Sequence, residues 1–172
     1  MSFHPMLIRP CIPGEELILL DLFRSSVRGL ASRDYRPEQI EAWSPAVVTQ
    51  EMRAQWCERI RSNQPCVAVV DREAAGFAEV QPSGCINQFF VAAPVSGKGI
   101  ASALMARLHG VASARGTARL FSHVSLTAQP FFARRGFGVV EERLPVVRGV
   151  SLRNAVMTKD LVTAARGEWT SR

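Results

Sequence analysis

The stretch from Val91 to Met105 constrains the fold more than any other part of the chain. It follows an apolar run, Phe89–Val91, that predicts a buried strand, and it begins with a loop that contains Gly97 and Gly99. From Ile100 onward, apolar residues recur at helical spacing, which predicts a helix. A strand, a glycine-bearing loop and a helix in this order can bind phosphate. The glycines let the backbone approach closely, and the free N–H groups of the first helical turn face the anion.

The glycine pair alone does not separate a phosphate site from an ordinary loop that enters a helix. A dinucleotide-binding fingerprint is excluded, because Ser102 stands where that motif has its third glycine. A P-loop is excluded as well, because its Gly-Lys-Ser/Thr ending is absent. A second motif is needed to identify the site.

That second motif lies downstream. Residues Ser96–Ala101 resemble the Arg/Gln-x-x-Gly-x-Gly/Ala signature of the GNAT N-acetyltransferase superfamily, with serine where arginine or glutamine is usual. Residues Ala128–Phe137 resemble the second GNAT motif, Ala-x-x-(aromatic)-Tyr-x-x-x-Gly-Phe, at a fitting separation. The resemblance extends from Leu7 to about Leu161. The segments Tyr35–Trp43 and Ser125–Phe132 are similar to the YafP-like branch of small bacterial acetyltransferases.

The resemblance implies an α/β GNAT fold, a mixed and mostly antiparallel sheet that splays at its centre, with helices on both faces. We expect one domain over residues 1–172, with a core of about 6–162 and a flexible tail at 163–172. The implied activity is transfer of an acetyl group from acetyl-CoA to a primary amine, by direct attack in a ternary complex. The acceptor is expected to be a small molecule. Alternatives are a protein N-terminus or lysine, or a non-catalytic acyl-CoA-binding module.

The resemblance also places the cofactor along the strand, the glycine loop and the second motif. The expected cofactor contacts are Phe89, Phe90, Val91, Ser96, Gly97, Lys98, Gly99, Ile100, Ala101, Ser102, Ser125, Thr127, Pro130, Phe131, Phe132 and Arg135.

The general acid departs from the family pattern. The GNAT tyrosine that protonates the departing thiolate corresponds to Phe132, which has no proton to donate. Ser125, Thr127, Tyr35 or a water molecule are the alternatives, and the sequence leaves them open.

Glu79 is the first candidate for the base that accepts the amine proton, because many GNAT enzymes have an acidic residue on the corresponding strand. His123 is the second candidate, since an imidazole titrates near neutral pH. An exposed strand carboxylate and a structural histidine are the simpler interpretations of the two residues. Asn87 could orient a water, and Cys85 stands where histone-type relatives carry a catalytic glutamate.

Tyr35 and Trp43 lie in a helical segment, Ser32–Ser44, between the first two predicted strands. In GNAT folds this region forms one wall of the acceptor pocket, so both are candidates to bind the acceptor. The competing interpretation is that they are anchors of the hydrophobic core.

The net charge of +6 and the pI near 9.9 fit attraction of an anionic cofactor better than nucleic-acid binding, because no long run of lysine and arginine occurs. The four scattered cysteines predict buried free thiols rather than a metal site. No apolar run approaches the roughly 20 residues of a membrane span. We expect a cytoplasmic protein without a metal or a membrane partner, either a monomer or a homodimer.

Periodicity and turn residues predict the remaining elements. The expected strands are Met6–Arg9, Gln64–Asp71, Ala75–Gln81, Cys85–Val91 and Ala118–Ser125, followed by a closing pair, Phe137–Val147 and Leu152–Leu161. The expected helices end near Gly29, lie within Ser32–Ser44, run over Thr49–Ser62 and Gly99–Ala114, and include a short helix capped by Thr127.

Overall fold

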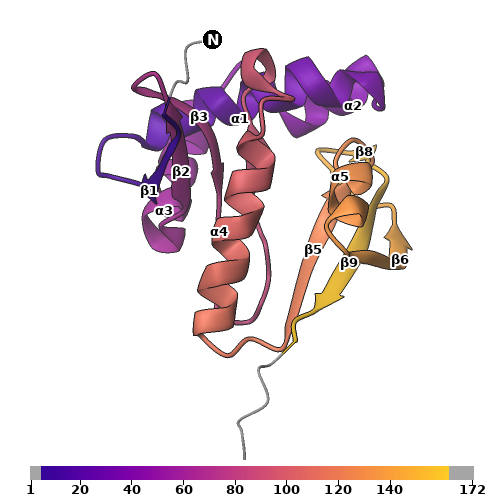
Figure 1. Ribbon diagram of the computed structural model, residues 1–172. Coiled ribbons are helices and arrows are strands. Elements are labelled where there is room, and N and C mark those ends of the chain that lie inside the picture. Colours follow the sequence, from indigo (N-terminus) through magenta and orange to yellow (C-terminus); the bar gives the residue numbers. More distant parts are fainter. Residues whose placement is uncertain (1–4, 163–172) are drawn as a thin grey trace, which may run out of the picture.

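The computed structural model describes residues 5–162, so the tail predicted at 163–172 lies outside the described residues (Figure 1). The strands are β1 (Leu7–Pro10), β2 (Cys66–Val70), β3 (Glu73–Ala78), β4 (Phe89–Val91), β5 (Arg119–Ser125), β6 (Gly138–Arg143), β7 (Val146–Val147), β8 (Val150–Ser151) and β9 (Asn154–Asp160). The helices are α1 (Glu16–Leu30), α2 (Pro37–Trp43), α3 (Gln50–Asn63), α4 (Ile100–Ala114) and α5 (Gln129–Arg134), with short 3-10 turns at Ala31–Arg33 and Ala93–Val95.

The strands form two antiparallel sheets that diverge on either side of α4 (Figure 1). One sheet has the order β1-β2-β3-β4, and the other has the order β5-β9-β6. Strands β7 and β8 form a separate hairpin, which lies between β6 and β9 in the chain. Within the described residues, an isolated parallel bridge joins Cys85, in the segment that leads into β4, to Phe121 on β5. The predicted splayed, mostly antiparallel sheet is therefore confirmed.

A serine hydroxyl marks the point where the two sheets part. The backbone of Phe121 donates to Gly84 O and accepts from Ile86 N. A continued parallel ladder would next use the carbonyl of Ile86. That carbonyl instead accepts a hydrogen bond from the hydroxyl of buried Ser122, at 2.7 Å. Beyond this bond β5 runs away from β4.

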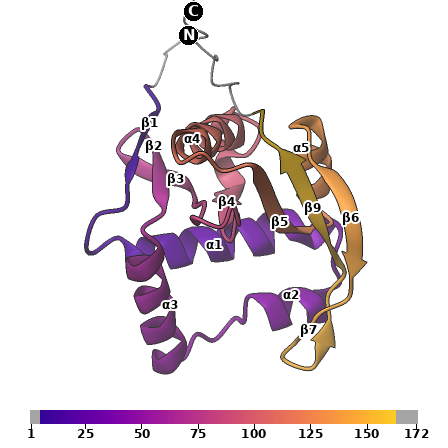
Figure 2. The same cartoon turned by 90° about the horizontal axis from the view of Figure 1, so that it is seen from below.

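Helices cover both faces of the first sheet, because successive residues of each strand point to opposite sides. On β2, Val67 packs with α1 and α3, in a cluster that includes Leu19, Trp56 and Phe77. The next residue, Ala68, packs on the other face with residues of α4 such as Leu104. Figure 2 shows α1 and α4 on opposite sides of β4.

Three local predictions were wrong. The strand expected over Cys85–Val91 is a strand only at Phe89–Val91, because residues 84–86 bond to β5 and the chain then changes partner to β3. The closing pair is divided: β6 ends at Arg143, and the turn at 148–149 belongs to the separate β7–β8 hairpin. Thr127 does not cap α5, whose N-cap is Ala128 and has no side-chain cap bond.

The cysteine prediction was correct in part. All four cysteines are free thiols, as expected, but each is partly exposed rather than fully buried.

Candidate active site

The backbone edge of β4 that faces β5 is the first component of the site. Glu79 N bonds to Gln88 O, and Ala92 N bonds to Ala75 O, so the even-numbered residues of this segment pair with β3. In an antiparallel pair, alternate residues direct their backbone groups to opposite edges of the strand. The N–H and C=O groups of Phe89 and Val91 therefore face away from β3, toward the opening between the two sheets. Phe90, also expected to bind the cofactor, instead pairs its backbone with Phe77 on β3.

The loop after β4 forms the second component. Gly97 and Gly99 have φ values of 80° and 82°, in the left-handed region that residues with a Cβ rarely adopt. A Cβ at either position would meet no atom within 4 Å, so glycine is needed here for its conformation rather than for space. The loop leads directly into α4, whose first turn presents N–H groups without intrahelical acceptors.

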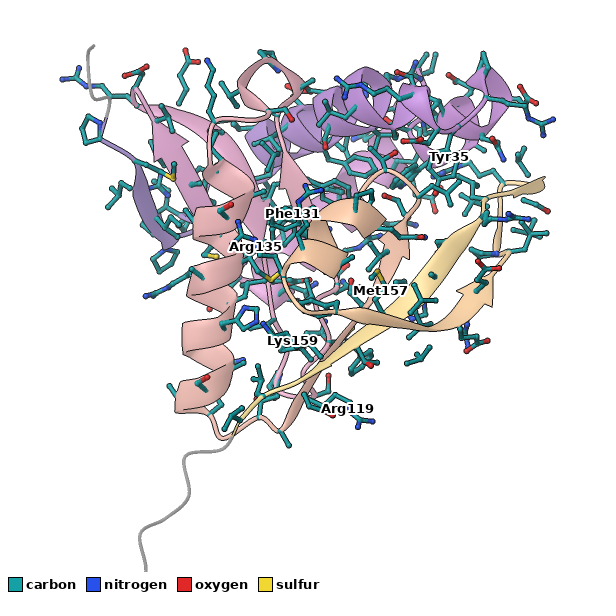
Figure 3. The ribbon with its side chains drawn as sticks, turned by 45° about the vertical axis from the view of Figure 1, so that its right-hand side comes forward. Tyr35, Arg119, Phe131, Arg135, Met157 and Lys159 are labelled. Atoms are coloured by element: carbon teal, nitrogen blue, oxygen red, sulfur yellow. The ribbon has the colours of Figure 1, made fainter. Side chains whose placement is uncertain are left out.

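Aromatic rings and an arginine from α5 form the opposite wall. Phe132 is 2% exposed, and its ring centroid lies 5.6 Å from that of Phe89 on β4. Arg135 lies over the ring of Phe131 at 5.3 Å and donates a hydrogen bond to the hydroxyl of Ser102 on α4. Figure 3 shows Phe131 and Arg135 on the side of α5 that faces α4.

These walls enclose a groove of about 600 Å³, here called the α4 groove. Every residue predicted to bind the cofactor lines it except Lys98 and Pro130. The groove also includes Trp43, which was predicted to bind the acceptor. It has further lining residues that sequence reasoning missed: Ser26, Val27, Leu30, Ala31, Arg33, Ala128 and Arg134. Most of the missed residues come from α1 and the turn after it, and no local motif indicated that this helix would reach the loop.

One hydroxyl in the α4 groove has no hydrogen-bond partner among the described residues. The Oγ1 atom of Thr127 is buried and unpaired, whereas Ser125 Oγ accepts from Ala128 N at 3.3 Å. The hydrogen-bonding capacity of Thr127 Oγ1 is therefore not used by any described residue.

A second cavity of about 340 Å³, here called the α3 pocket, adjoins the groove. Trp43 and Phe90 line both cavities, so the two meet at these side chains. The other lining residues are Leu20, Phe23, Arg24, Ser44, Pro45, Val48, Met52, Gln55, Trp56, Arg59, Asn87, Gln88 and Arg148.

Glu79 lies directly behind the wall of the α3 pocket. The residue is 4% exposed, and its Oε1 accepts from Asn63 Nδ2 at 2.8 Å and from pocket-lining Asn87 Nδ2 at 3.1 Å. Oε2 is buried without a partner among the described residues. Burial raises the pKa of the Glu79 carboxyl above its usual value, against the opposing effect of the two amide donors and of Arg59.

The other predicted catalytic residues lie outside both cavities. The hydroxyl of Tyr35 donates to Arg153 O at 2.5 Å and accepts from Leu126 N at 3.0 Å, and the residue is 6% exposed. Its ring packs edge-on against Trp43 at 5.5 Å, so the core-anchor interpretation describes Tyr35, while Trp43 lines the site. His123 is exposed on β5 and lines neither cavity.

Residues 5–162 provide neither a metal site nor a membrane-spanning helix. The described side chains contain no group of three or more His, Cys, Asp or Glu residues placed to hold a metal ion. None of the described helices is long and apolar enough to span a bilayer.

A diverging sheet with a free strand edge, a glycine loop and a helix N-terminus at its opening defines an acyltransferase of the GNAT type. The acetyltransferase (GNAT) domain model matches residues 31–159. The chain belongs to the GNAT acetyltransferase family, and it is an N-acetyltransferase.

Individual relatives agree with this assignment. The chain is 31% identical over 150 residues to the uncharacterized N-acetyltransferase YafP of Escherichia coli (strain K12), covering 87% of this chain and 93% of that protein. A GCN5-related N-acetyltransferase from Rhodopseudomonas palustris has a TM-score of 0.85 at 28% identity, covering 94% of this chain and 99% of that one. The PaiA N-acetyltransferase of Thermoplasma acidophilum, solved with coenzyme A, shares the fold at a TM-score of 0.69 and 18% identity, covering 91% and 99% of the two chains.

Proposed function

We propose that the chain transfers the acetyl group of acetyl-CoA to the primary amine of a small molecule, by direct attack in a ternary complex. The observation that carries the proposal is the α3 pocket, which meets the α4 groove at Trp43 and Phe90. Its volume of about 340 Å³ is at the small end of the range typical of ligand sites. A small amine held there would reach an acetyl group at the junction.

The residues of the α4 groove fit acetyl-CoA, which supplies the thioester that is cleaved. The free backbone groups of Phe89 and Val91 can bind an extended amide chain as an added strand would. The N–H groups from Gly97 to Ser102, at the N-terminus of α4, can donate hydrogen bonds to the phosphates. Arg135 adds a guanidinium at the same end of the groove.

Glu79 is the proposed base. An amine must lose a proton to attack, and a carboxylate at its ordinary pKa is a weak base at neutral pH. Burial raises the pKa of Glu79 toward a useful value. Because Glu79 lies behind Asn87, we propose that the proton travels through one water molecule, which the Asn87 amide helps to orient.

During the transfer, negative charge develops on the carbonyl oxygen of the acetyl group and on the departing sulfur. A free N–H group of Phe89 or Val91 can donate to the carbonyl oxygen as it becomes negative. The Thr127 hydroxyl can donate a hydrogen bond to the departing sulfur, which Phe132 cannot do. In the balanced reaction a nitrogen–carbon bond forms and the carbon–sulfur bond breaks. The amine proton passes to Glu79, and the thiolate is protonated by solvent.

The domain organisation, the oligomeric state and the cellular compartment are also proposals. We propose that residues 1–172 form one domain, which acts as a monomer or homodimer. The cytoplasm is the proposed compartment, because four free thiols suit a reducing environment.

The experiment is a panel of small amines, amino-terminal peptides and lysine peptides with acetyl-CoA, in which release of the free thiol is followed. Turnover of small amines supports the proposal. Turnover of peptides alone would assign the chain to the protein acetyltransferases. Tight binding of acetyl-CoA without turnover of any amine would identify a non-catalytic acyl-CoA-binding module.

A further inference from the structure

The α3 pocket is lined by three arginines that come from separate parts of the chain. Arg24 lies on α1, Arg59 on α3 and Arg148 at the turn between β7 and β8. Among the described residues that line this pocket, none is acidic. The side chains that line the pocket therefore carry a net positive charge.

None of these three arginines forms an ion pair with a carboxylate of the described residues. A longer-range electrostatic attraction acts between Arg24 and Glu41 and between Arg59 and Glu79. Arg24 donates to Ala46 O at 2.9 Å, and Arg148 donates to Ala42 O at 2.7 Å. The guanidinium of Arg59 lies 6.0 Å from the centre of the Trp56 ring. A carbonyl or a ring orients a guanidinium but leaves its full positive charge in place.

Two other arginines on α1 and α3 do form ion pairs with carboxylates. Arg28, on α1, forms an ion pair with Glu41 at 2.6 Å, and Arg61, on α3, forms one with Glu16 at 2.8 Å. Both lie outside the lining of the α3 pocket. Of the arginines on α1 and α3 without an ion pair among the described residues, Arg24 and Arg59 line the pocket and Arg53 is exposed outside it.

Unpaired polar atoms in the pocket wall are an independent observation. Arg24 Nε, Ser44 Oγ and Gln88 Oε1 are buried and have no hydrogen-bond partner among the described residues. Ser44 is 1% exposed and Gln88 is 5% exposed. Each of these atoms has hydrogen-bonding capacity that no described residue uses, which fits a pocket that holds a polar ligand.

We infer that the acceptor is an amine that also carries an anionic group, either a carboxylate or a phosphate. This inference rests on the proposed function. A simple ammonium ion would be repelled by three arginines, whereas an anionic group offsets their charge and binds them directly. The same positive surroundings lower the pKa of the amine, which favours its neutral, nucleophilic form. The anionic group is oriented by the arginines and the amine points toward Trp43 and Phe90.

Two matched pairs of amines test the inference. In the carboxylate pair, β-alanine is compared with β-alaninamide, and in the phosphate pair O-phosphoethanolamine is compared with ethanolamine. The quantity measured is the ratio of kcat/KM for the anionic and neutral members, in the wild-type protein and in Arg59→Gln and Arg148→Gln. A ratio is used because Arg59 also lowers the pKa of Glu79, and an effect on the base changes both members alike. Arg53→Gln is the control, since it removes an equal charge from an exposed site on α3 outside the pocket.

The anionic member of at least one pair should be preferred at least about tenfold by the wild-type protein, as expected for a charge-assisted contact. The preferred pair identifies the anion as carboxylate or phosphate. Each pocket variant should reduce that preference about tenfold, and Arg53→Gln should leave it unchanged. Equal use of both members, or preference for the neutral ones, overturns the inference while N-acetylation of small amines stands. If no amine of the wider panel is acetylated by protein that binds acetyl-CoA, both the inference and the proposed function fail.

Discussion

The α4 groove and the α3 pocket meet at Trp43 and Phe90, yet they are built in different ways. The groove depends mainly on backbone: two glycines with positive φ, a free strand edge and a helix N-terminus. The pocket depends on side chains, with three arginines and a buried glutamate behind its wall. A groove made of backbone can accept one constant ligand in many sequences, whereas a pocket made of side chains can be specific for one acceptor.

The largest expected effect is on the backbone of the groove. Gly99→Val places a β-branched residue at a φ of 82°, so the loop must change conformation. The N–H groups of the loop can then no longer converge on one phosphate group. We expect acetyl-CoA binding to fall by more than about 100-fold, below detection by calorimetry, in a folded protein. Gly110→Val is the control, because Gly110 lies on the exposed side of the same helix and its Cβ would meet no atom within 4 Å. Unchanged affinity in folded Gly99→Val would show that the loop does not bind the cofactor.

The second prediction distinguishes the α3 pocket from the α4 groove, because a change behind the pocket wall should lower turnover without altering acetyl-CoA binding. Glu79→Gln keeps the shape of the side chain and removes the base, and turnover should fall by roughly 100-fold or more. The deficit should shrink as pH rises, since the amine then loses its proton unaided. Glu73→Gln, on the exposed start of β3, is the matched control. If the pH–rate profiles of Glu79→Gln and wild type coincide, His123 is the next candidate, despite its distance from both cavities, and His123→Ala tests it.

These regions also differ in how far sequence could predict them. The groove residues come mainly from two short runs, around Phe89–Ser102 and Ser125–Arg135, and each run has a recognisable local pattern. The pocket residues extend from Leu20 to Arg148, and no local pattern relates Arg24, Arg59 and Arg148. Their proximity is a product of tertiary packing alone.

Glu79 is an intermediate case. Strand alternation placed it on the same face as Phe77, and both side chains are buried. The sequence could not show that Asn63, at the end of α3, would donate to its carboxylate, because that contact depends on how α3 packs against the sheet. Tyr35 was misleading for the same reason: the backbone groups that bind its hydroxyl, Arg153 O and Leu126 N, are distant in the chain.

A smaller effect tests whether side chains matter in the groove at all. Phe132 packs against Phe89 and Phe137 and also lines the groove. Phe132→Leu should weaken acetyl-CoA binding about threefold to tenfold, corresponding to ~1 kcal/mol of lost ring contact. Phe132→Tyr should retain affinity, since the ring is kept. If Phe132→Leu leaves both affinity and turnover at wild-type values, Phe132 is ordinary core and the alignment of the second motif is incorrect.

The smallest expected effect is on the stability of the folded protein, and it depends on Glu79, behind the wall of the α3 pocket. Because the pKa of Glu79 is raised in the folded state, the unfolded chain releases this proton at a lower pH than the folded protein does. The wild-type protein should therefore lose stability relative to Glu79→Gln as pH rises from the ordinary carboxyl pKa through the raised value. Thermal unfolding of both proteins across this range measures the difference, which should be a few degrees or less. A constant difference at all pH values would mean that Glu79 titrates normally, which would remove the argument for its role as base.

The hydrogen bond from Ser122 to the carbonyl of Ile86 has a consequence for the kinetics of association. The carbonyl at the end of the shared ladder is already satisfied, so extending the β4–β5 pairing would have to break that bond first. The opening between the sheets is thus present before any ligand arrives, and no strand pair must separate to admit one. Binding should accordingly be a single second-order step, with an observed rate that rises linearly with acetyl-CoA concentration and no plateau from a preceding conformational change.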